Sequence, residues 1–143
     1  MSRRSCLLTL SALQLAMVQI GCRCGTAVTH VADAQALGPY SASASTRELV
    51  FVSGKIGSPQ DAFEVQAASA LREVRATLIA SGSDWDRVVN VTVYLTNIDD
   101  YASFNSIYSE LVPAPRPARS VVAVAGLPKG ARVEIAVTAA RAH

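Results

Sequence analysis

The chain has 143 residues, half of them hydrophobic, which is enough for one domain with an ordinary apolar core. Three of its 13 basic residues fall in the first 23 positions, and from Gly25 onward 10 basic residues face 11 acidic ones, a net charge of −1. This balance removes the usual electrostatic reason to propose a nucleic-acid or anionic-membrane partner.

The cysteines and histidines restrict the chemistry further. Cys6, Cys22 and Cys24 all lie within the first 24 residues, so the remaining chain has no thiol for a disulfide, a metal site or a covalent intermediate. The two histidines, His30 and His143, lie near the ends of that remaining part, too few for a His-based zinc site or a Ser-His-Asp triad. Any catalysis must use carboxylate, arginine, hydroxyl, amide or backbone groups.

Residues 1–24 have the layout of an export signal, with two arginines before an apolar stretch, Cys6–Val18, that is too short for a membrane span. The end of the segment resembles a bacterial lipoprotein signal, which would place a lipid anchor at Cys22, although Gln19 stands where that pattern has leucine. The alternative is that translation begins at Met17. We expect an exported protein, periplasmic or lipid-anchored, in which residues 25–143 form a single domain.

The first clear strand spans residues 48–53, rich in β-branched and aromatic side chains, and ends at Gly54. A helix follows and stops near Gly82. Its apolar residues recur at helical spacing: Phe63, Ala67, Leu71, Val74 and Leu78.

Residues 87–95 alternate between apolar and polar side chains, which predicts a half-buried strand. Its buried positions are Val89, Val91, Val93 and Leu95. Two acidic residues then begin a second helix, which prolines 113, 115 and 117 end. The stripe expected to be buried on this helix is Tyr101, Phe104, Tyr108 and Leu111.

Two strands close the chain, residues 120–124 and 132–137, and the turn at 126–130 predicts that they form a hairpin. The full order is strand, strand, helix, strand, helix, strand, strand. This order predicts an α+β fold with both helices packed on one face of the sheet.

Two charged residues in the closing strands could carry chemistry. Glu134 lies on the face opposite Val133, Ile135 and Val137, where a solvated charge would be the ordinary explanation. In the predicted hairpin Glu134 lies nearly opposite Val122, so Arg119 is about 10 Å away along the strands, a spacing that suits a small ligand. Arg119 would bind a carboxylate in two-point geometry, and Glu134 would be the base that activates water.

Other polar residues are weaker candidates. Tyr40 belongs to a turn, Ser53 and Gly54 lie at a strand end, and Asn105 lies on the second helix. Each has an ordinary structural explanation, so the residues by themselves give only a set of polar candidates.

Six short segments in order resemble the Rid family, also called YjgF-like proteins, over about residues 36–141. The segments are Leu37-Gly38-Pro39-Tyr40-Ser41, Val52-Ser53-Gly54-Lys55-Ile56-Gly57, Asn90-Val91-Thr92-Val93-Tyr94-Leu95, Phe104-Asn105-Ser106-Ile107-Tyr108, Pro117-Ala118-Arg119-Ser120 and Leu127-Pro128-Lys129-Gly130-Ala131-Arg132-Val133-Glu134-Ile135. Each segment is weak alone, but six at compatible spacing make a specific match.

The resemblance implies a chorismate-mutase-like mixed sheet and a homotrimer with sites between subunits. It also implies hydrolytic deamination of 2-imino and 2-enamino acids to 2-oxo acids and ammonia, without a cofactor. In the family the arginine matching Arg119 binds the substrate carboxylate and the acid matching Glu134 positions water. The residues matching Tyr40, Ser53, Gly54 and Asn105 line the same pocket.

Two positions depart from the family pattern near the pocket. Lys55 stands where many members have glutamine, and Val121 where some have cysteine. Other functions stay open: a non-catalytic trimer that binds small carboxylates or protects other proteins, a ribonuclease, or a deaminase of aminomuconate-type compounds. The export segment also conflicts with the cytoplasmic origin of most imines.

Overall fold

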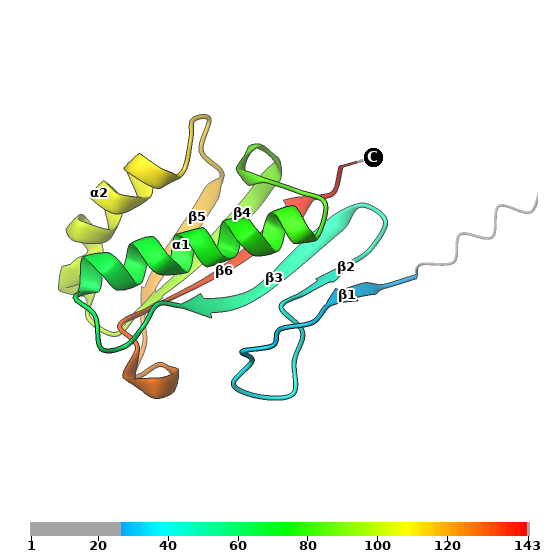
Figure 1. Cartoon of the computed structure of the whole chain (residues 1–143). Coiled ribbons are helices and arrows are strands. Elements are labelled where there is room, and N and C mark those ends of the chain that lie inside the picture. The colour runs from blue at the N-terminus through cyan, green and yellow to red at the C-terminus, as the bar shows by residue number, and fades with distance from the viewer. Residues whose placement is uncertain (1–26, 143) are drawn as a thin grey trace, which may run out of the picture.

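The computed structural model describes residues 27–142, so the predicted export segment lies outside the described residues. Six strands form one sheet in the order β1-β2-β3-β6-β4-β5 and two helices accompany it (Figure 1). The strands are β1 Thr29–Val31, β2 Ser43–Ser45, β3 Leu49–Ile56, β4 Val88–Leu95, β5 Ala118–Ala123 and β6 Val133–Ala140; the helices are α1 Phe63–Ala80 and α2 Tyr101–Leu111. In this part of the chain, no helix has the length and apolarity needed to cross a membrane.

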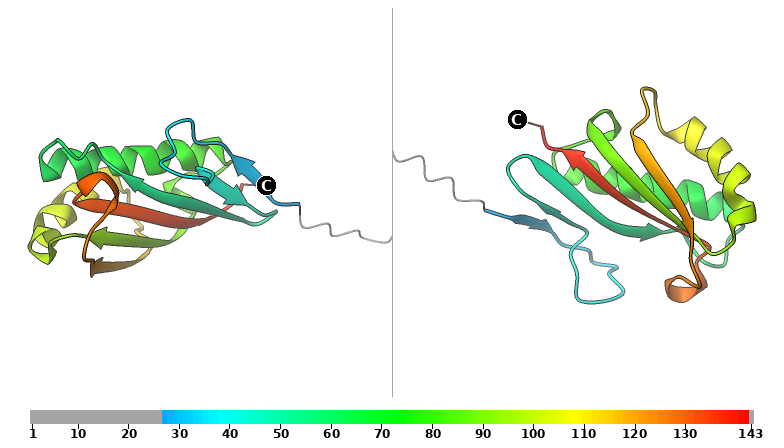
Figure 2. Two further views of the ribbon diagram at one scale, coloured as in Figure 1. Left: turned by 90° about the horizontal axis from the view of Figure 1, so that it is seen from below. Right: turned by 180° about the vertical axis from the view of Figure 1, so that it is seen from behind.

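Both helices lie on the same face of the sheet, as predicted, and leave the other face uncovered (Figure 2). Helix α1 packs against β3 and β6, and α2 packs beside α1. Helix α1 ends just before Gly82, whose φ of 77° is the left-handed conformation that glycine adopts without strain. The predicted α+β class and the mixed sheet are confirmed, since β4 and β5 are parallel and the other neighbours antiparallel.

The core fills the space between the helices and the covered face. On β6 every second side chain is buried, beginning with Val133 and Ile135, because alternate residues of a strand point to opposite faces. Leu71 and Leu78 of α1 and Phe104 of α2 are almost completely buried against this face. The apolar periodicity that predicted both helices therefore corresponds to one continuous core.

The predicted hairpin between the last two strands is wrong. Strand β5 pairs in parallel with β4 at the sheet edge, and β6 inserts between β3 and β4. The reason lies in α2, because a strand, helix, strand crossover brings the second strand back parallel to the first. The chain then crosses the end of β4 through a turn in which Lys129 and Gly130 are left-handed, with φ of 57° and 75°.

Two positions expected in the core are exposed. The pairing of β4 with β6 shifts register between Val88 and Asn90, and this bulge turns Val89 outward, leaving it 55% exposed. Tyr101, the first residue of α2, is 43% exposed, because the stripe that packs into the core begins one turn later at Phe104.

Candidate functional site

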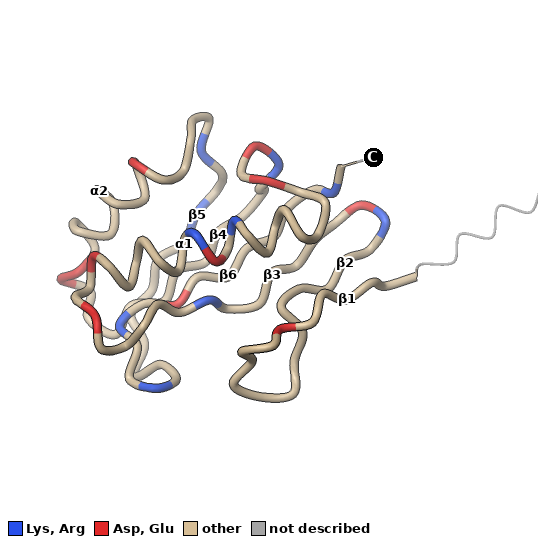
Figure 3. The backbone as a smooth tube through the Cα atoms, in the orientation of Figure 1, with Lys and Arg blue, Asp and Glu red and all other residues tan. Residues whose placement is uncertain are grey.

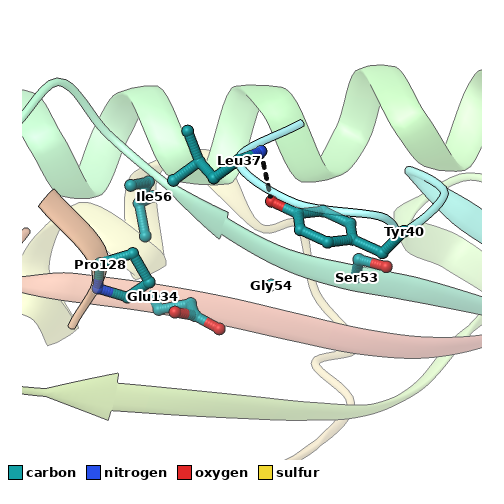
Figure 4. A pocket seen from close by; sticks show the side chains of 7 residues that line it. All are labelled: Leu37, Tyr40, Ser53, Gly54, Ile56, Pro128 and Glu134. Carbon is teal, nitrogen blue, oxygen red and sulfur yellow. Dashed lines mark hydrogen bonds between the residues drawn. The ribbon is translucent and has the colours of Figure 1, made fainter. Parts of the chain in front are cut away.

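Glu134 lies on β6 in the middle of the sheet, with Ile56 of β3 on one side and Tyr94 of β4 on the other. Its neighbours in sequence are buried beneath the helices, so its carboxylate belongs to the uncovered face. It contributes to a cavity of about 210 Å³ between β3, β6 and the loop that joins β1 to β2 (Figure 4). The lining residues are Leu37, Tyr40, Ser53, Gly54, Ile56, Pro128 and Glu134.

A bulge in β3 makes room for the Glu134 carboxylate. The register between β3 and β6 shifts between Val52 and Lys55, so Ser53 and Gly54 lie in an irregular stretch of the strand. A Cβ atom on Gly54 would overlap Oε1 of Glu134, so the carboxylate occupies space that only glycine leaves free. The sequence indicated Gly54 as a strand end, whereas the structure shows it as the floor beneath the acid.

The environment of Glu134 favours its protonated form. Burial raises the pKa of its carboxyl group above the ordinary value, because removal from water penalises the charged form. A carboxylate with a raised pKa, facing a cavity, is a better proton acceptor than one in free solution. The geometry and electrostatics are therefore those of a group that can orient and deprotonate a water molecule.

The loop between β1 and β2 brings Tyr40 over this cavity, and three contacts fix it. Lys55 Nζ on β3 forms an ion pair with Asp33 Oδ2 at 2.7 Å. Ser53 Oγ donates to the carbonyl of Ser41 at 2.7 Å. The Tyr40 hydroxyl accepts a hydrogen bond from the backbone N–H of Leu37 at 3.1 Å (Figure 4).

These contacts change the interpretation of two residues. Ser53 lines the cavity, but its hydroxyl proton is used to hold the loop, which leaves it as an acceptor toward a ligand. Lys55, which departs from the family pattern, has its charge paired to Asp33 and so anchors the same loop. The sequence could not identify Asp33 as its partner, because 22 residues separate the two.

Arg119 lies in a different place, at the edge strand β5, with its side chain directed at α2. Its Nη2 donates to Oδ1 of Asn105 at 2.6 Å, and its guanidinium carbon lies 4.5 Å from the ring centre of Tyr108. Stacking on an aromatic ring holds the planar guanidinium while leaving its edge free to form hydrogen bonds. The structure therefore joins the predicted residues Arg119 and Asn105 and adds Tyr108.

A second cavity of about 390 Å³ opens at Arg119. It is lined by Asn105, Tyr108, Ser109, Arg116, Pro117 and Arg119. The Tyr108 hydroxyl is buried and has no hydrogen-bond partner among residues 27–142. Burial raises the pKa of this phenol, and the positive charges of Arg119 and Arg116 oppose the shift. Arg116 and Tyr108 were not among the predicted site residues.

One chain does not bring Arg119 and Glu134 together. Arg119 pairs with Val91 of β4, and Val91 pairs with Val137 of β6. Val137 lies three residues beyond Glu134 along β6. Three residues along the strands and two strand spacings across the sheet separate their Cα atoms by about 14 Å. The two side chains also lie on opposite faces, so the predicted common pocket is divided into an Arg119 cavity and a Glu134 cavity.

The part of the chain that is similar to known proteins includes the residues of both cavities. A family model described as Endoribonuclease L-PSP matches residues 31–141. Reactive Intermediate Deaminase A of Arabidopsis thaliana is 40% identical over 107 residues, 70% of this chain and 57% of the plant protein. A human protein named 2-iminobutanoate/2-iminopropanoate deaminase is 35% identical over 111 residues, 73% of this chain and 81% of the human protein.

A solved structure gives the same answer for the fold. The crystal structure of E. coli TdcF with bound serine has a TM-score of 0.73 to this chain at 31% sequence identity, covering 80% of this chain and 100% of TdcF. Strands β2 to β6, both helices and the residues of both cavities fall within residues 31–141, the part of the chain that the family model matches, and β1 begins two residues earlier at Thr29. The chain therefore belongs to the YjgF/RidA family, which the Endoribonuclease L-PSP model describes.

Proposed function

We propose that the protein hydrolyses 2-imino and 2-enamino acids to 2-oxo acids and ammonia. The observation that carries the proposal is the combination of an aromatic-stacked arginine in one cavity and a partly buried carboxylate of raised pKa in the other. The names of the human and Arabidopsis relatives support the same chemistry.

Arg119 supplies the binding half of this reaction. Asn105 takes one N–H of its guanidinium, and the remaining N–H groups can form a two-point contact with a substrate carboxylate. Lysine could not reproduce this planar geometry. The substrate is therefore fixed through its carboxylate, which leaves C2, the electrophilic carbon of the imine, to be placed against the Glu134 carboxylate.

Glu134 supplies the hydrolytic half. It takes a proton from water while the water oxygen forms a bond to C2, and it returns that proton to the imine nitrogen as the double bond to C2 opens, which gives a 2-amino-2-hydroxy acid. In the second half of the reaction the proton of the C2 hydroxyl passes to the nitrogen, the C–N bond breaks, the C2 oxygen becomes the carbonyl of the 2-oxo acid, and the nitrogen leaves as ammonia. An enamine enters the same sequence after C3 gains a proton and the nitrogen loses one, which gives the imine.

A site that uses both residues requires two chains, and we infer that the Arg119 cavity of one subunit meets the Glu134 cavity of the next in the homotrimer that the family resemblance implies. The separation of about 14 Å across the sheet and the opposite faces argue against cooperation within one chain. The uncovered face also carries large exposed apolar side chains, including Phe51 at 46% and Val122 at 42%, which favours burial in an assembly.

The test is direct hydrolysis of an imine made in place. An L-amino-acid oxidase converts L-alanine to 2-iminopropanoate, and semicarbazide captures the imine that has not yet been hydrolysed as an absorbing semicarbazone. We expect the protein to lower the initial rate of semicarbazone formation. Glu134→Gln should lower kcat about 100-fold or more, the usual contribution of a general base.

Substitutions at Arg119 separate charge from geometry. Arg119→Lys keeps the charge but not the two-point contact, so its kcat/KM should lie between those of wild type and Arg119→Ala. Arg72→Ala, which removes an exposed arginine from α1, is the matched control and should behave like wild type. A protein that leaves the semicarbazone rate unchanged, or an Arg119→Ala variant as active as wild type, would contradict the proposal.

A further inference from the structure

The Arg119 cavity contains a second arginine that the proposed reaction does not use. Arg116 lines this cavity beside Arg119, and its Nη2 donates to the carbonyl oxygen of Ser109 at 3.1 Å. Simple 2-imino acids have one carboxylate, which Arg119 is sufficient to bind. Arg116 is exposed and uses one N–H on this carbonyl, so its remaining N–H groups are available to a second anion in the cavity.

The two guanidinium groups are anchored on successive turns of the same helix. Arg119 donates to the side-chain oxygen of Asn105 and Arg116 donates to the backbone carbonyl of Ser109, and the Cα atoms of residues four apart lie about 6 Å apart along a helix axis. In a dicarboxylic acid of four or five carbons, three or four C–C bonds of about 1.5 Å join the carboxyl carbons, so the two carboxylates lie about 4–5 Å apart. This length is comparable with the spacing along the helix of the two residues that hold the guanidinium groups.

Neither charge is neutralised within residues 27–142. The ion pairs there are Lys55 with Asp33, Arg75 with Asp84 and Arg132 with Asp100, and neither Arg116 nor Arg119 takes part in one. The residues that line the Arg119 cavity include no acidic residue. Figure 3 shows basic positions on the segment that leads into β5 and at the start of that strand. Glu110 of α2 lines a different cavity, beside Arg75 and Trp85.

The wall of the cavity also has a hydrogen-bond donor without an acceptor. The Tyr108 hydroxyl is buried and unpartnered in the described part of the chain, and burying such a group without a partner is unfavourable. The charges of Arg119 and Arg116 both act on this hydroxyl. The cavity therefore contains two guanidinium groups and a phenol but no acidic side chain. These groups offer more hydrogen-bond donors to an anion than one carboxylate needs.

We propose that Arg116 binds a second carboxylate and that the preferred substrates are 2-imino dicarboxylic acids of four or five carbons. This inference rests on the proposed function, because the same hydrolysis at C2 applies: water adds, ammonia leaves, and a 2-oxo dicarboxylic acid results. Arg119 holds the carboxylate next to C2, and Arg116 holds the carboxylate at the far end of the chain. Reactions that oxidise acidic amino acids to imines would supply such substrates.

The experiment compares two imines that differ in one carboxylate. An aspartate oxidase makes 2-iminobutanedioate and an alanine-active oxidase makes 2-iminopropanoate, and the ratio of the two kcat/KM values is measured with the full chain. We expect wild type to favour the dicarboxylic imine. Loss of a charge-assisted hydrogen bond at Arg116→Ala should lower the ratio about tenfold or more, with a smaller fall for Arg116→Lys and a larger one for Arg116→Glu. Arg72→Ala should leave the ratio unchanged.

Failure of this inference can be distinguished from failure of the proposed function. If wild type hydrolyses 2-iminopropanoate but Arg116→Ala changes the ratio less than about twofold, the second anion position is wrong and the deaminase proposal stands. If wild type hydrolyses neither imine, both are wrong. Calorimetry with the products adds a readout independent of turnover: 2-oxobutanedioate should bind more tightly than 2-oxopropanoate in wild type, and equal affinities would overturn the inference.

Discussion

Activity should return when two inactive variants assemble together. Arg119→Ala and Glu134→Gln each remove one half of the proposed site, and the two residues lie about 14 Å apart on opposite faces of the sheet. In a mixed assembly, a site that takes Arg119 from a Glu134→Gln subunit and Glu134 from an Arg119→Ala subunit is complete. Within a single chain of either variant no complete site exists.

The size of the recovery follows from the geometry. With equal amounts and random mixing, half of the subunits can supply Arg119 and half can supply Glu134, so about a quarter of all interfaces carry a complete site. This fraction is the same for a dimer, a trimer or a larger ring, because each site depends on one ordered pair of neighbours. We therefore expect about 25% of wild-type kcat per site.

The assay is imine hydrolysis after the two variants are unfolded together and refolded, with mixing verified by native mass spectrometry. The matched control mixes Arg119→Ala with Asn105→Ala, two changes within the same cavity. No subunit in that mixture has an intact Arg119 cavity, so activity should not exceed that of the separate variants. Verified mixing of Arg119→Ala with Glu134→Gln without recovery would refute a site shared between chains.

Four further predictions concern Glu134, its glycine neighbour and the core. Because burial raises the pKa of Glu134, kcat/KM should fall with decreasing pH at a pKa above 4.5, and this acid limb should be absent from Glu134→Gln. A raised carboxyl pKa also means that wild type loses stability as pH rises through the pKa of Glu134 in the folded state. The melting temperature of Glu134→Gln should therefore be higher than that of wild type at pH 7 and equal to it below pH 4.5. A lower melting temperature of this variant at pH 7 would contradict the reasoning. Gly54→Ala should displace the carboxylate and reduce kcat/KM about 100-fold with an unchanged circular dichroism spectrum, whereas Gly126→Ala, where an added Cβ meets nothing within 4 Å, should have no effect. Leu71→Ala should reduce the free energy of unfolding in urea by about 3 kcal/mol, against less than about 0.5 kcal/mol for Val65→Ala on the exposed side of the same helix.

The sequence alone determined the local structure and the family. Apolar spacing from Phe63 to Leu78 placed α1 within two residues of its observed C-terminal end, because the periodicity of a helix is contained in neighbouring residues. Alternation likewise located β6 and predicted that Glu134 faces away from the core. Six short segments indicated the family that the comparisons show.

The tertiary structure alone decided which strands are neighbours. Residues 120–124 and 132–137 have the pattern of a hairpin, but hydrogen bonding across the whole sheet places β4 between β5 and β6. Pairing between distant segments leaves no local signature, which is also why the ion pair of Lys55 with Asp33 and the bulge that exposes Val89 could not be predicted. This difference in strand order separates Arg119 from Glu134 and divides the single expected pocket into two cavities. Side chains on non-adjacent strands and on opposite faces of a sheet cannot contact the same small ligand within one chain.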